Sequence, residues 1–410
     1  MRLKATGFFG AAAVVHLVLL AACGPRFTRE AVIVTDSAGV TIVDSDGEQP
    51  AWTRETTWRL SARPAIQVGN QPYDPSQRIY GGEHTRRMPD GGIVVANRGL
   101  GDVRIFDAGG YHLQTLRIVI DPEIQEGRPR RVYPISPDSL VIYHGGGELS
   151  LWNAQLERVQ RVPVQRPEGL EETELEPAGD WFADGTLLFT GRIPLDPSLT
   201  GLQRTRMRLL HYDVDGRLIG TIGDFDADTE MVGEDVYVWG PSAHVAVADS
   251  TVWYAPGDRW EIREVALDGR TLRIFRLDKP MDVVTNADRS AFRVGAVRQL
   301  IQAGEENAEE IVDSTYTHAE TFPAWSQILV DEVGNVWARA YRWFDMGADY
   351  PWTVFDRDGR YLGEVIVPYP LTVHEIGDDY VLGHMADGRG GEAVYIYRLE
   401  KPVAGAATEP

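Results

Sequence analysis

The sequence predicts an all-β protein, a six-bladed β-propeller made of four-stranded antiparallel blades. Three observations predict this fold: a tight hairpin that recurs at a blade-sized period, a second hairpin inside most repeats, and spare strand-like segments near the N-terminus. The 410 residues exceed what one simple two-layer core supports, so repeats or two domains are required. Apolar residues make up 43% of the chain and there is one cysteine, so packing must stabilise the core without an intramolecular disulfide.

The recurring hairpin joins two short apolar runs through Asp-Gly, Asp-Ser or Gly-Asn, which tolerate the positive φ of a tight turn. It is found in RRMPDGGIVVAN from residue 86, YPISPDSLVIYH from 133, DWFADGTLLFTG from 180, VAVADSTVWYA from 245, ILVDEVGNVWARA from 328 and VHEIGDDYVLGH from 373. Three of the five steps between successive turns measure 43 to 48 residues. The two longer steps require insertions, so the six repeats fit the period of propeller blades.

A second hairpin inside most repeats brings each blade to four strands. It is found in VRIFDAGGYHLQTL from residue 103, LSLWNAQLERVQRV from 149, LLHYDVDGRLIGTI from 209, IREVALDGRTLRIF from 262 and WTVFDRDGRYLGEV from 352. The sixth repeat ends without a fourth strand, whereas strand-like segments at 32–44 and 57–68 have no partner. We expect one of them, preferably the second, to complete the last blade, so deletion of residues 24–70 should unfold the whole ring.

The first residues have the pattern of an export signal. Arg2 and Lys4 precede an apolar run from Phe8 to Ala22, which is shorter than the about 20 residues that a membrane-spanning helix needs. Leu20-Ala21-Ala22-Cys23 resembles the bacterial lipobox. The resemblance implies cleavage before Cys23 and a diacylglyceryl group on its sulfur, while the alternative is a free cysteine in an ordinary signal peptide.

These features predict a lipoprotein signal peptide at residues 1–22 and a tether at 23–30. We expect the protein to be exported and anchored by lipid on Cys23 to the bacterial cell envelope, at the outer membrane facing the periplasm or the surface. Loss of the two basic residues with the signal peptide changes the formal net charge from −21 to −23. A chain this acidic, without a Lys/Arg run, is not expected to bind nucleic acid, and we expect a monomer.

Two stretches carry a resemblance to a known family. MPDGGIVVAN with VRIFDAGGYHLQTL, and FPAWSQILVDEVGNVWARAYRW at residues 322–343, resemble the bacterial six-bladed β-propeller lipoproteins related to NHL-like and TolB-like propellers. The resemblance covers most of residues 31–402, where it implies a propeller, and leaves 403–410 as a disordered tail. Its motifs are turns and core strands, so it implies a fold and no particular chemistry.

We label the strands of a blade A to D from the channel outward. The A–B and C–D turns are short and form one end of the ring, here called the turn face. The extra chain is expected in B–C and D–A connections, at residues 190–205, 224–241, 278–323 and 341–351, which form the long-loop face. Insertions on one face commonly build a binding surface. The alternative is that these loops accept inserted residues at little cost in stability and have no function.

Cationic and aromatic side chains of these loops are the candidate ligand contacts, because Arg and Trp anchor many protein and carbohydrate contacts. They are Arg98, Arg259, Trp260, Arg342, Trp343 and Arg389. A helical insertion is expected at about 285–319 between blades 4 and 5. Its first helix should be capped by Asn286 or Asp288 and should bury one apolar face. Its second helix should point Ala308, Ile311 and Val312 toward the protein interior. The apolar face of the first helix consists of Phe292, Ala296, Val297, Leu300 and Ile301. The insertion is either a lid or simple packing.

Patterns for catalysis are weak. His374 and His384 are placed on adjacent strands without metal-ligand spacing, and no nucleophile or phosphate-binding motif is present. Asp224, Asp226 and Asp228 with Asp235 echo a calcium loop, but Thr229 stands where that loop needs glycine. We therefore expect no metal and no cofactor, with calcium as the alternative.

The resulting hypothesis is a binding or scaffold module for protein, peptide or glycan that uses the long-loop face. The alternative is a metal-dependent hydrolase or lyase acting in the channel, as in some six-bladed propellers. The sequence favours binding because it lacks ordered polar ligands from several blades.

Overall fold

The computed structural model describes residues 31–69, 74–118, 127–136, 139–196, 198–233, 235–343, 347–386 and 391–402. Residues 31–410 form one compact unit, distinct from residues 1–30. The predictions for the signal peptide, the tether, Cys23, Arg389 and the tail at 403–410 lie outside the described residues. Within the described ranges, no helix is long and apolar enough to cross a membrane.

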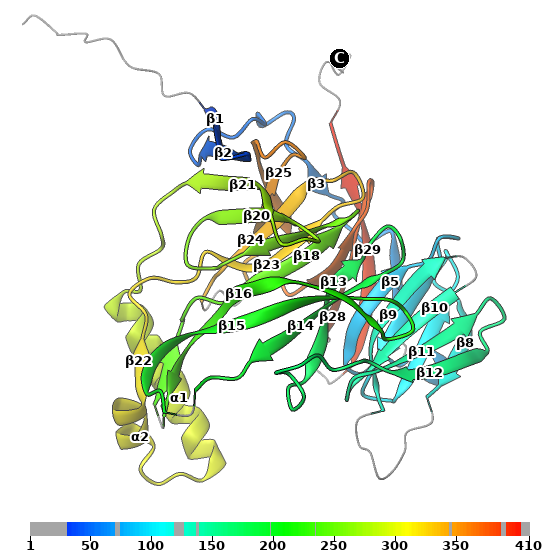
Figure 1. Cartoon of the computed structure of the whole chain (residues 1–410), viewed down its shortest axis with the longest axis horizontal. Helices are drawn as coiled ribbons and strands as arrows, with labels where there is room; N and C mark the ends of the chain where they lie inside the picture. Colours follow the sequence, from blue (N-terminus) through cyan, green and yellow to red (C-terminus); the bar gives the residue numbers. More distant parts are fainter. Residues whose placement is uncertain are drawn as a thin grey trace, which may run out of the picture. The chain divides into compact units, whose positions relative to one another are not determined.

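Six antiparallel four-stranded sheets follow one another along the chain, which confirms the all-β, six-bladed prediction (Figure 1). Blade 1 contains β5 (Gly82–Arg87), β6 (Ile93–Asn97), β7 (Asp102–Phe106) and β8 (His112–Arg117). Blade 2 contains β9 (Pro129–Ser136), β10 (Ser139–His144), β11 (Glu148–Asn153) and β12 (Arg158–Pro163). Blade 3 contains β13 (Leu175–Trp181), β14 (Leu187–Ile193), β15 (Gly201–Tyr212) and β16 (Leu218–Val232).

The second half of the chain repeats the arrangement. Blade 4 contains β18 (His244–Ala248), β19 (Thr251–Ala255), β20 (Glu261–Ala266) and β21 (Thr271–Asp278). Blade 5 contains β23 (Trp325–Val330), β24 (Val336–Ala340), β25 (Tyr350–Phe355) and β26 (Tyr361–Val367). Blade 6 contains β27 (Thr372–Ile376), β28 (Tyr380–Ala386) and β29 (Glu392–Glu400). The short helix η1 (Pro75–Gln77) precedes blade 1.

The turn chemistry read from the sequence is present at the A–B hairpins. Gly91, Gly185 and Gly334 have φ of 85°, 83° and 89°, and Asp249 has φ of 51°. These left-handed conformations are open to glycine and tolerated by aspartate, which explains why those residue types recur at this junction.

The N-terminal region closes the ring, as predicted. β4 (Ile66–Gly69) pairs antiparallel with β29, with Ile66 opposite Ile396 and Val68 opposite Val394. Val68 is 1% exposed and lies in one hydrophobic cluster with side chains of blades 6 and 1. Blade 6 therefore takes its fourth strand from the beginning of the chain.

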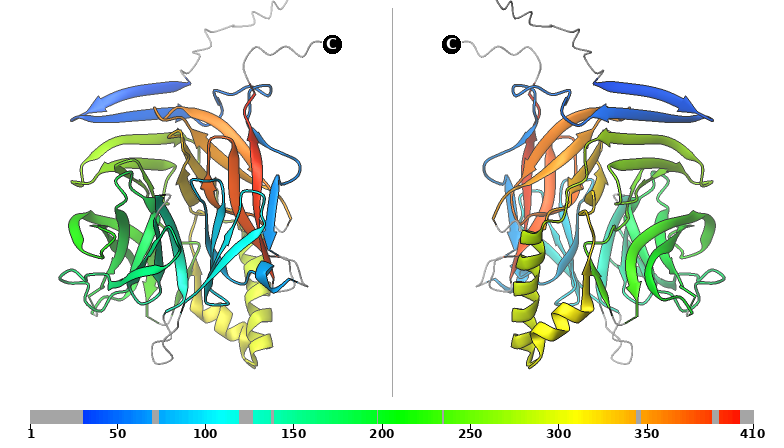
Figure 2. Two further views of the ribbon diagram at one scale, coloured as in Figure 1. Left: turned by 90° about the vertical axis from the view of Figure 1, so that its right-hand side faces the viewer. Right: turned by 90° about the vertical axis from the view of Figure 1, so that its left-hand side faces the viewer.

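The preceding residues, 31–60, form a strap along the outer strands of blades 4, 5 and 6. β1 (Val32–Ser37) pairs with β2 (Val40–Asp46), and β2 runs parallel to β21. Next, the backbone N–H of Trp52 donates to the carbonyl of Leu362 at 2.7 Å. β3 (Arg59–Leu60) then pairs with β29. Figure 2 shows the β1–β2 hairpin beside β21 at the outer edge of blade 4.

Every pair of neighbouring blades shares a buried apolar cluster, including the pair formed by blades 6 and 1. Between blades 6 and 1 the cluster includes Ile93 and Phe106 on one side and Leu382 and Val394 on the other. The other five clusters join blades 1 and 2, 2 and 3, 3 and 4, 4 and 5, and 5 and 6. Burial of apolar surface at all six junctions makes the ring one cooperative core.

Two predicted loops of blade 3 are largely strand, which corrects the sequence interpretation. Residues 190–205 and 224–241 contribute to β15 and β16, which pair from Tyr212 with Leu218 out to Gly201 with Val232. The physical reason is that exposed side chains alternate with more buried ones along much of β16, which is the period of a strand, and that β16 pairs with β15 out to Gly201. This ribbon extends from the long-loop face.

The helical insertion lies where it was predicted, between blades 4 and 5. It consists of α1 (Asn286–Ala303) and α2 (Ala308–Thr315), followed by β22 (Tyr316–His318), which runs parallel to β17 (Val236–Val238). The cap of α1 is Thr285, not Asn286 or Asp288: its hydroxyl accepts from the Asp288 N–H at 3.2 Å. The Asp288 carboxylate accepts from the Thr285 N–H at 2.8 Å, which completes a capping box. The two predicted caps therefore lie one and three residues beyond the actual one.

The burial of the insertion is only partly as predicted. Ala308 and Val312 of α2 are buried and Ile311 is half-buried, as expected. No residue of α1 is buried, however, and Ile301 is 61% exposed, because the helix contacts α2 and an aromatic cluster along a narrow edge. Phe292 supplies that edge, with its ring centroid 5.6 Å from that of Trp239.

Candidate functional site

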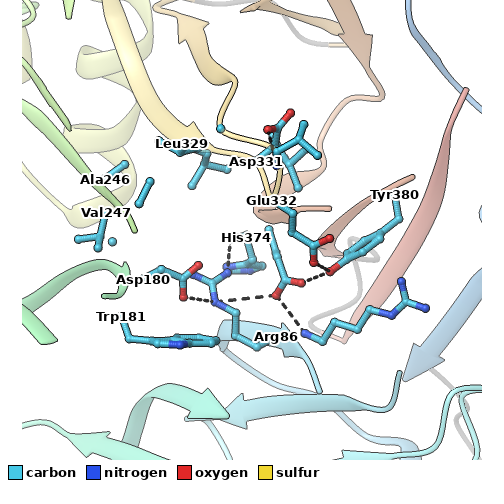
Figure 3. Close-up of a pocket in the computed structure, with 18 of the residues that line it drawn as sticks. Arg86, Asp180, Trp181, Ala246, Val247, Leu329, Asp331, Glu332, His374 and Tyr380 are labelled. Atoms are coloured by element: carbon cyan, nitrogen blue, oxygen red, sulfur yellow. Dashed lines mark hydrogen bonds and ion pairs between the residues drawn. The ribbon is translucent and has the colours of Figure 1, made fainter. Parts of the chain in front are cut away.

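A cavity of about 810 Å³ opens on the turn face of the ring. It is lined by the A strands of all six blades, by A–B turns and by Arg357 of the C–D turn of blade 5. Figure 3 shows the polar side chains at its centre. No residue of the helical insertion lines it, so the insertion is not a lid over this cavity. The sequence interpretation had placed the binding surface on the long-loop face, opposite this cavity.

Arg86 occupies the centre of the site. It comes from β5, its side chain is 3% exposed, and its Nε donates to Asp180 Oδ1 of β13 at 2.9 Å. The same nitrogen lies 3.9 Å from Glu375 Oε2 of β27, and Nη1 donates to the carbonyl of His374. Burial acts to lower the pKa of Arg86, but the two carboxylates outweigh it and the pKa is raised. One cation thus joins blades 1, 3 and 6, and pairing offsets the cost of burying it.

A second element of the site is a row of three groups, Glu375, Tyr380 and Glu332. The Tyr380 hydroxyl contacts Glu375 Oε1 and lies 3.2 Å from Glu332 Oε1. Glu375 Oε2 also accepts the N–H of Arg87 at 3.0 Å. Burial raises the pKa of Glu375 to about 7, against the opposing effect of Arg86.

The geometry of this row can hold one proton more than the phenol supplies. A phenol has one hydrogen, so Tyr380 can donate to Glu375 or to Glu332 but not to both. If both contacts are hydrogen bonds, one carboxyl must be protonated and donate to the phenol oxygen. We refer to Glu332, Tyr380 and Glu375 with this shared proton as the acid triad.

Histidines lie beside the arginine. His374 Nε2 and His384 Nδ1 are 2.6 Å apart across β27 and β28, the adjacent strands that the sequence predicted. Burial lowers the pKa of both imidazoles, His374 the more strongly. They are therefore neutral rings in which one nitrogen donates and the other accepts.

Two polar atoms near the bottom of the cavity have no partner among the described residues. His84 Nε2 and Tyr133 Oη are buried and make no hydrogen bond. Their rings are 5.5 Å apart, and they adjoin two cavity residues, since Tyr133 is 6.0 Å from Trp181 and His84 is 5.9 Å from His374. Buried polar atoms in native proteins are almost always satisfied, so a water or a ligand atom is required here.

The candidate contacts of the sequence analysis lie on the B–C connections of the long-loop face, but the structure does not gather them. Trp260 is 5% exposed, donates from Nε1 to the carbonyl of Pro280 at 3.1 Å, and packs 4.7 Å from Trp325. Trp343 packs 5.0 Å from Trp239 in a different cluster. Both indoles are therefore used in packing.

The cationic candidates are distributed over three blades. Arg259 pairs with Asp258 at 3.0 Å and with Glu261 at 3.3 Å. Arg98 and Arg342 are exposed, on blades 1 and 5. Arg389 lies outside the described residues.

The acidic run that suggested calcium lies on β16. Asp224 accepts two bonds from Arg208, at 2.6 and 2.9 Å. Alternate residues of a strand are about 6.6 to 7 Å apart along it, so Asp224, Asp226 and Asp228 cannot converge on one ion as loop residues do. Over the described part of the chain, no three His, Cys, Asp or Glu side chains are grouped to hold a metal ion.

The residues at the centre of the cavity were missed by sequence reasoning. Arg86, Asp180 and Glu375 each stand a few residues before an A–B turn, at the inner end of strand A. Charged residues at the end of an innermost strand, as in GEHTRR of β5, are the signal that could have located them, because the channel offers such side chains a polar environment.

Comparisons with known proteins support the fold. No family model and no curated protein matches the sequence. A solved structure of a member of the DUF4221 family from Bacteroides vulgatus is 11% identical, covers 85% of this chain and 100% of its own, and has a TM-score of 0.52. Regucalcin from Agrobacterium tumefaciens, a calcium-binding protein, is 12% identical, with coverage of 83% and 96% and a TM-score of 0.40. Virginiamycin B lyase from Staphylococcus aureus is 9% identical, with coverage of 84% and 99% and a TM-score of 0.41. At 11% identity the likeness to the DUF4221 structure shows the propeller fold alone.

Proposed function

We propose that this protein is an exported, lipid-tethered β-propeller that acts as a binding module, holding a peptide, a protein segment or a glycan in its turn-face cavity. The observation that carries the proposal is the cavity itself. Its volume of about 810 Å³ is within the range typical of ligand pockets, roughly 300–1,000 Å³. A site of this size can take several residues of an extended chain.

The cavity is also held in a fixed arrangement before any ligand arrives. Arg86 joins strands of three blades, and Tyr380 links blades 5 and 6 through Glu332 and Glu375. Groups fixed in this way lose little conformational entropy when a ligand binds, which favours affinity. The tight A–B turns around the mouth add to this rigidity.

The cavity is a better candidate than the long-loop face, where the hypothesis first placed the ligand. Trp260 and Trp343 are engaged in blade packing, so their rings are not available as anchors. Arg259 and Arg342 are the exposed members of that set on blades 4 and 5. We retain them as comparison positions in the test below.

The tether is a separate part of the proposal. Lipid on Cys23 confines the propeller to the envelope surface, and two or more acyl chains hold it there durably. A module that concentrates a ligand at the membrane needs no catalytic group.

Catalysis in the same cavity is the second candidate, and one observation favours it. Burial places the pKa of Glu375 at about 7, where a carboxyl can act as general acid or base. In that case Glu375→Gln abolishes product formation from the captured partner while capture itself persists.

The proposal is tested by capture of partners from envelope extracts with the compact unit of residues 31–410. Leu329 lines the cavity, and Leu329→Trp reduces the free space without changing charge. Leu362→Trp is the matched control, because Leu362 is a half-buried leucine of the same apolar cluster that does not line the cavity. We expect Leu329→Trp to lose the partner captured by wild type and Leu362→Trp to keep it.

The double variant Arg259→Ala, Arg342→Ala tests whether the partner binds the long-loop face instead. If this pair loses the partner while Leu329→Trp keeps it, the ligand binds the long-loop face and the cavity proposal is wrong. Equal capture by all variants also contradicts it.

A further inference from the structure

We infer that the ligand group that enters the cavity is an organic cation, an alkylammonium or a guanidinium such as a lysine-like or arginine-like side chain, and that it displaces the proton of the acid triad. This inference rests on the proposed binding function and specifies its ligand chemistry. It is carried by four features of the same cavity: its charge, its free carboxylates, its apolar wall and its shared proton.

The lining has an excess of negative charge. Seven carboxyl groups and three guanidinium groups line the cavity, which leaves four carboxyls in excess. One guanidinium, that of Arg86, is already buried between two of the carboxylates. A second, that of Arg87, lies over the ring of Tyr380 at 4.5 Å from its centroid. Charge complementarity therefore favours a cation and disfavours phosphate or carboxylate ligands.

Acidic residues from A–B turns of several blades stand at the mouth. Asp90, Asp249, Glu332 and Asp379 come from blades 1, 4, 5 and 6, and all four are exposed. The carboxyls of Asp249 and Asp379 make no hydrogen bond or ion pair with any described residue. The aspartates that suit the turn backbone thus also provide free acceptors for a ligand.

The wall between the mouth and the centre is apolar. Trp181, Val247, Leu329 and Ile376 line it, and Figure 3 shows Trp181, Val247 and Leu329 around Arg86 and Asp180. Long cationic side chains bury an aliphatic stem and keep the charged end among polar groups. An indole face also attracts such a cation.

The acid triad supplies a site that responds to the cation. A positive group beside Glu375 favours the ionised form of this carboxyl, so its proton leaves for solvent when the ligand binds. Two carboxylates then face one ammonium or guanidinium, and the charge of Glu375 is shared between the ligand and Arg86. Binding therefore releases up to one proton per ligand.

The unpartnered His84 Nε2 and Tyr133 Oη provide an independent reason to expect a polar group in the same channel. Each is more than nine-tenths buried, and each adjoins a residue of the cavity wall. Each of these two atoms therefore forms a hydrogen bond with a water molecule or with a polar atom of the ligand at the inner end of the site.

The test is calorimetric titration of the unit of residues 31–410 with the peptide acetyl-Leu-Lys-Leu-Lys-amide and with its twin acetylated on both lysine side chains. We expect the acetylated twin to bind at least tenfold more weakly. With a pKa of about 7, Glu375 is about one-tenth ionised at pH 6 and about nine-tenths ionised at pH 8. The lysine peptide should therefore bind up to about tenfold more tightly at pH 8 than at pH 6. At pH 7 its binding heat should differ between phosphate and Tris buffers, because the buffer takes up the released proton.

Three variants separate the parts of the inference. Glu375→Gln should abolish the pH dependence and the buffer dependence. Asp249→Asn combined with Asp379→Asn should weaken the binding of the lysine peptide. The control Asp282→Asn with Glu364→Gln removes the same charge at exposed positions outside the cavity and should not weaken it.

Two outcomes overturn the inference. Equal binding of the peptide and its acetylated twin contradicts a cationic ligand but leaves the proposed binding function in place. No binding of either peptide up to millimolar concentration also contradicts it, and the capture experiment with Leu329→Trp then decides the proposed function separately.

Discussion

The closure of the ring by β4 is tested by the substitution Val68→Ala. Val68 is 1% exposed and packs with Ile79, Val394 and Ile396 at the junction of blades 6 and 1. The substitution removes two buried methyl groups and keeps the backbone pairing with β29. If the ring is one cooperative core, a defect in this strand lowers the stability of the whole domain.

The expected magnitude follows from the burial. Each buried methyl group contributes about 0.8 kcal/mol of transfer free energy, and the cavity left behind adds a comparable cost. Val68→Ala should therefore lower the free energy of unfolding by about 2–3 kcal/mol. The matched control is Val34→Ala in β1, where the side chain is 63% exposed, and it should change the stability by less than about 0.5 kcal/mol.

Urea denaturation followed by tryptophan fluorescence and by circular dichroism measures both variants. We expect a single transition for each, with a lower midpoint for Val68→Ala alone. Equal midpoints for the two variants would refute the burial argument. A separate early transition in Val68→Ala, with the remaining signal unfolding as in wild type, would refute the cooperative ring.

Three further predictions concern the anchor, the central arginine and a buried histidine. Cys23→Ser should abolish incorporation of a fatty-acid probe and move the protein from the membrane fraction to the soluble fraction; unchanged fractionation would contradict lipid anchoring. Arg86→Gln should destabilise the domain by about 3 kcal/mol, because Asp180 and Glu375 lose their counter-charge, and should raise the pKa of Glu375 further, measured by carboxyl NMR titration. Burial lowers the pKa of His144 from 6.5 to about 4, so the unfolded chain binds its proton first as the pH falls. The stability that neutral His144 contributes is present above pH 6.5 and is lost towards pH 4, by up to about 3 kcal/mol, and His144→Asn should flatten this slope in denaturation curves.

Much of the fold could be predicted because its signals are local. The Asp-Gly and Gly-Asn turns specify hairpins within about a dozen residues, and their repetition specifies blades. The closing strand could be predicted because the sixth repeat lacked a strand that residues 57–68 could supply. The extension of β15 and β16 was missed because it exceeds the usual length of a blade strand and depends on the pairing of the two segments with each other from Gly201 to Val232.

The site could not be predicted, because its residues meet only when the ring closes. Arg86 contacts Asp180 and His374, which are 94 and 288 positions away in the chain. No local motif links such positions. The Arg and Trp residues chosen from the long loops carried a compositional signal, but composition does not distinguish a ligand anchor from a packing residue such as Trp260, which is 5% exposed. The cap of α1 at Thr285 shows the smaller error typical of element boundaries.

The most direct test of the central claim is photo-crosslinking of a lysine peptide that carries a benzophenone side chain, followed by mass spectrometry of the crosslinked fragments. If the ligand binds in the cavity, crosslinks should form at residues 246–249, 329–334 and 374–380, which contain cavity-lining residues. Unlabelled lysine peptide added as a competitor should reduce these crosslinks strongly, and the unlabelled acetylated twin should reduce them far less. Crosslinks concentrated in the B–C loops around residues 98–101, 256–260 and 341–343 would contradict it.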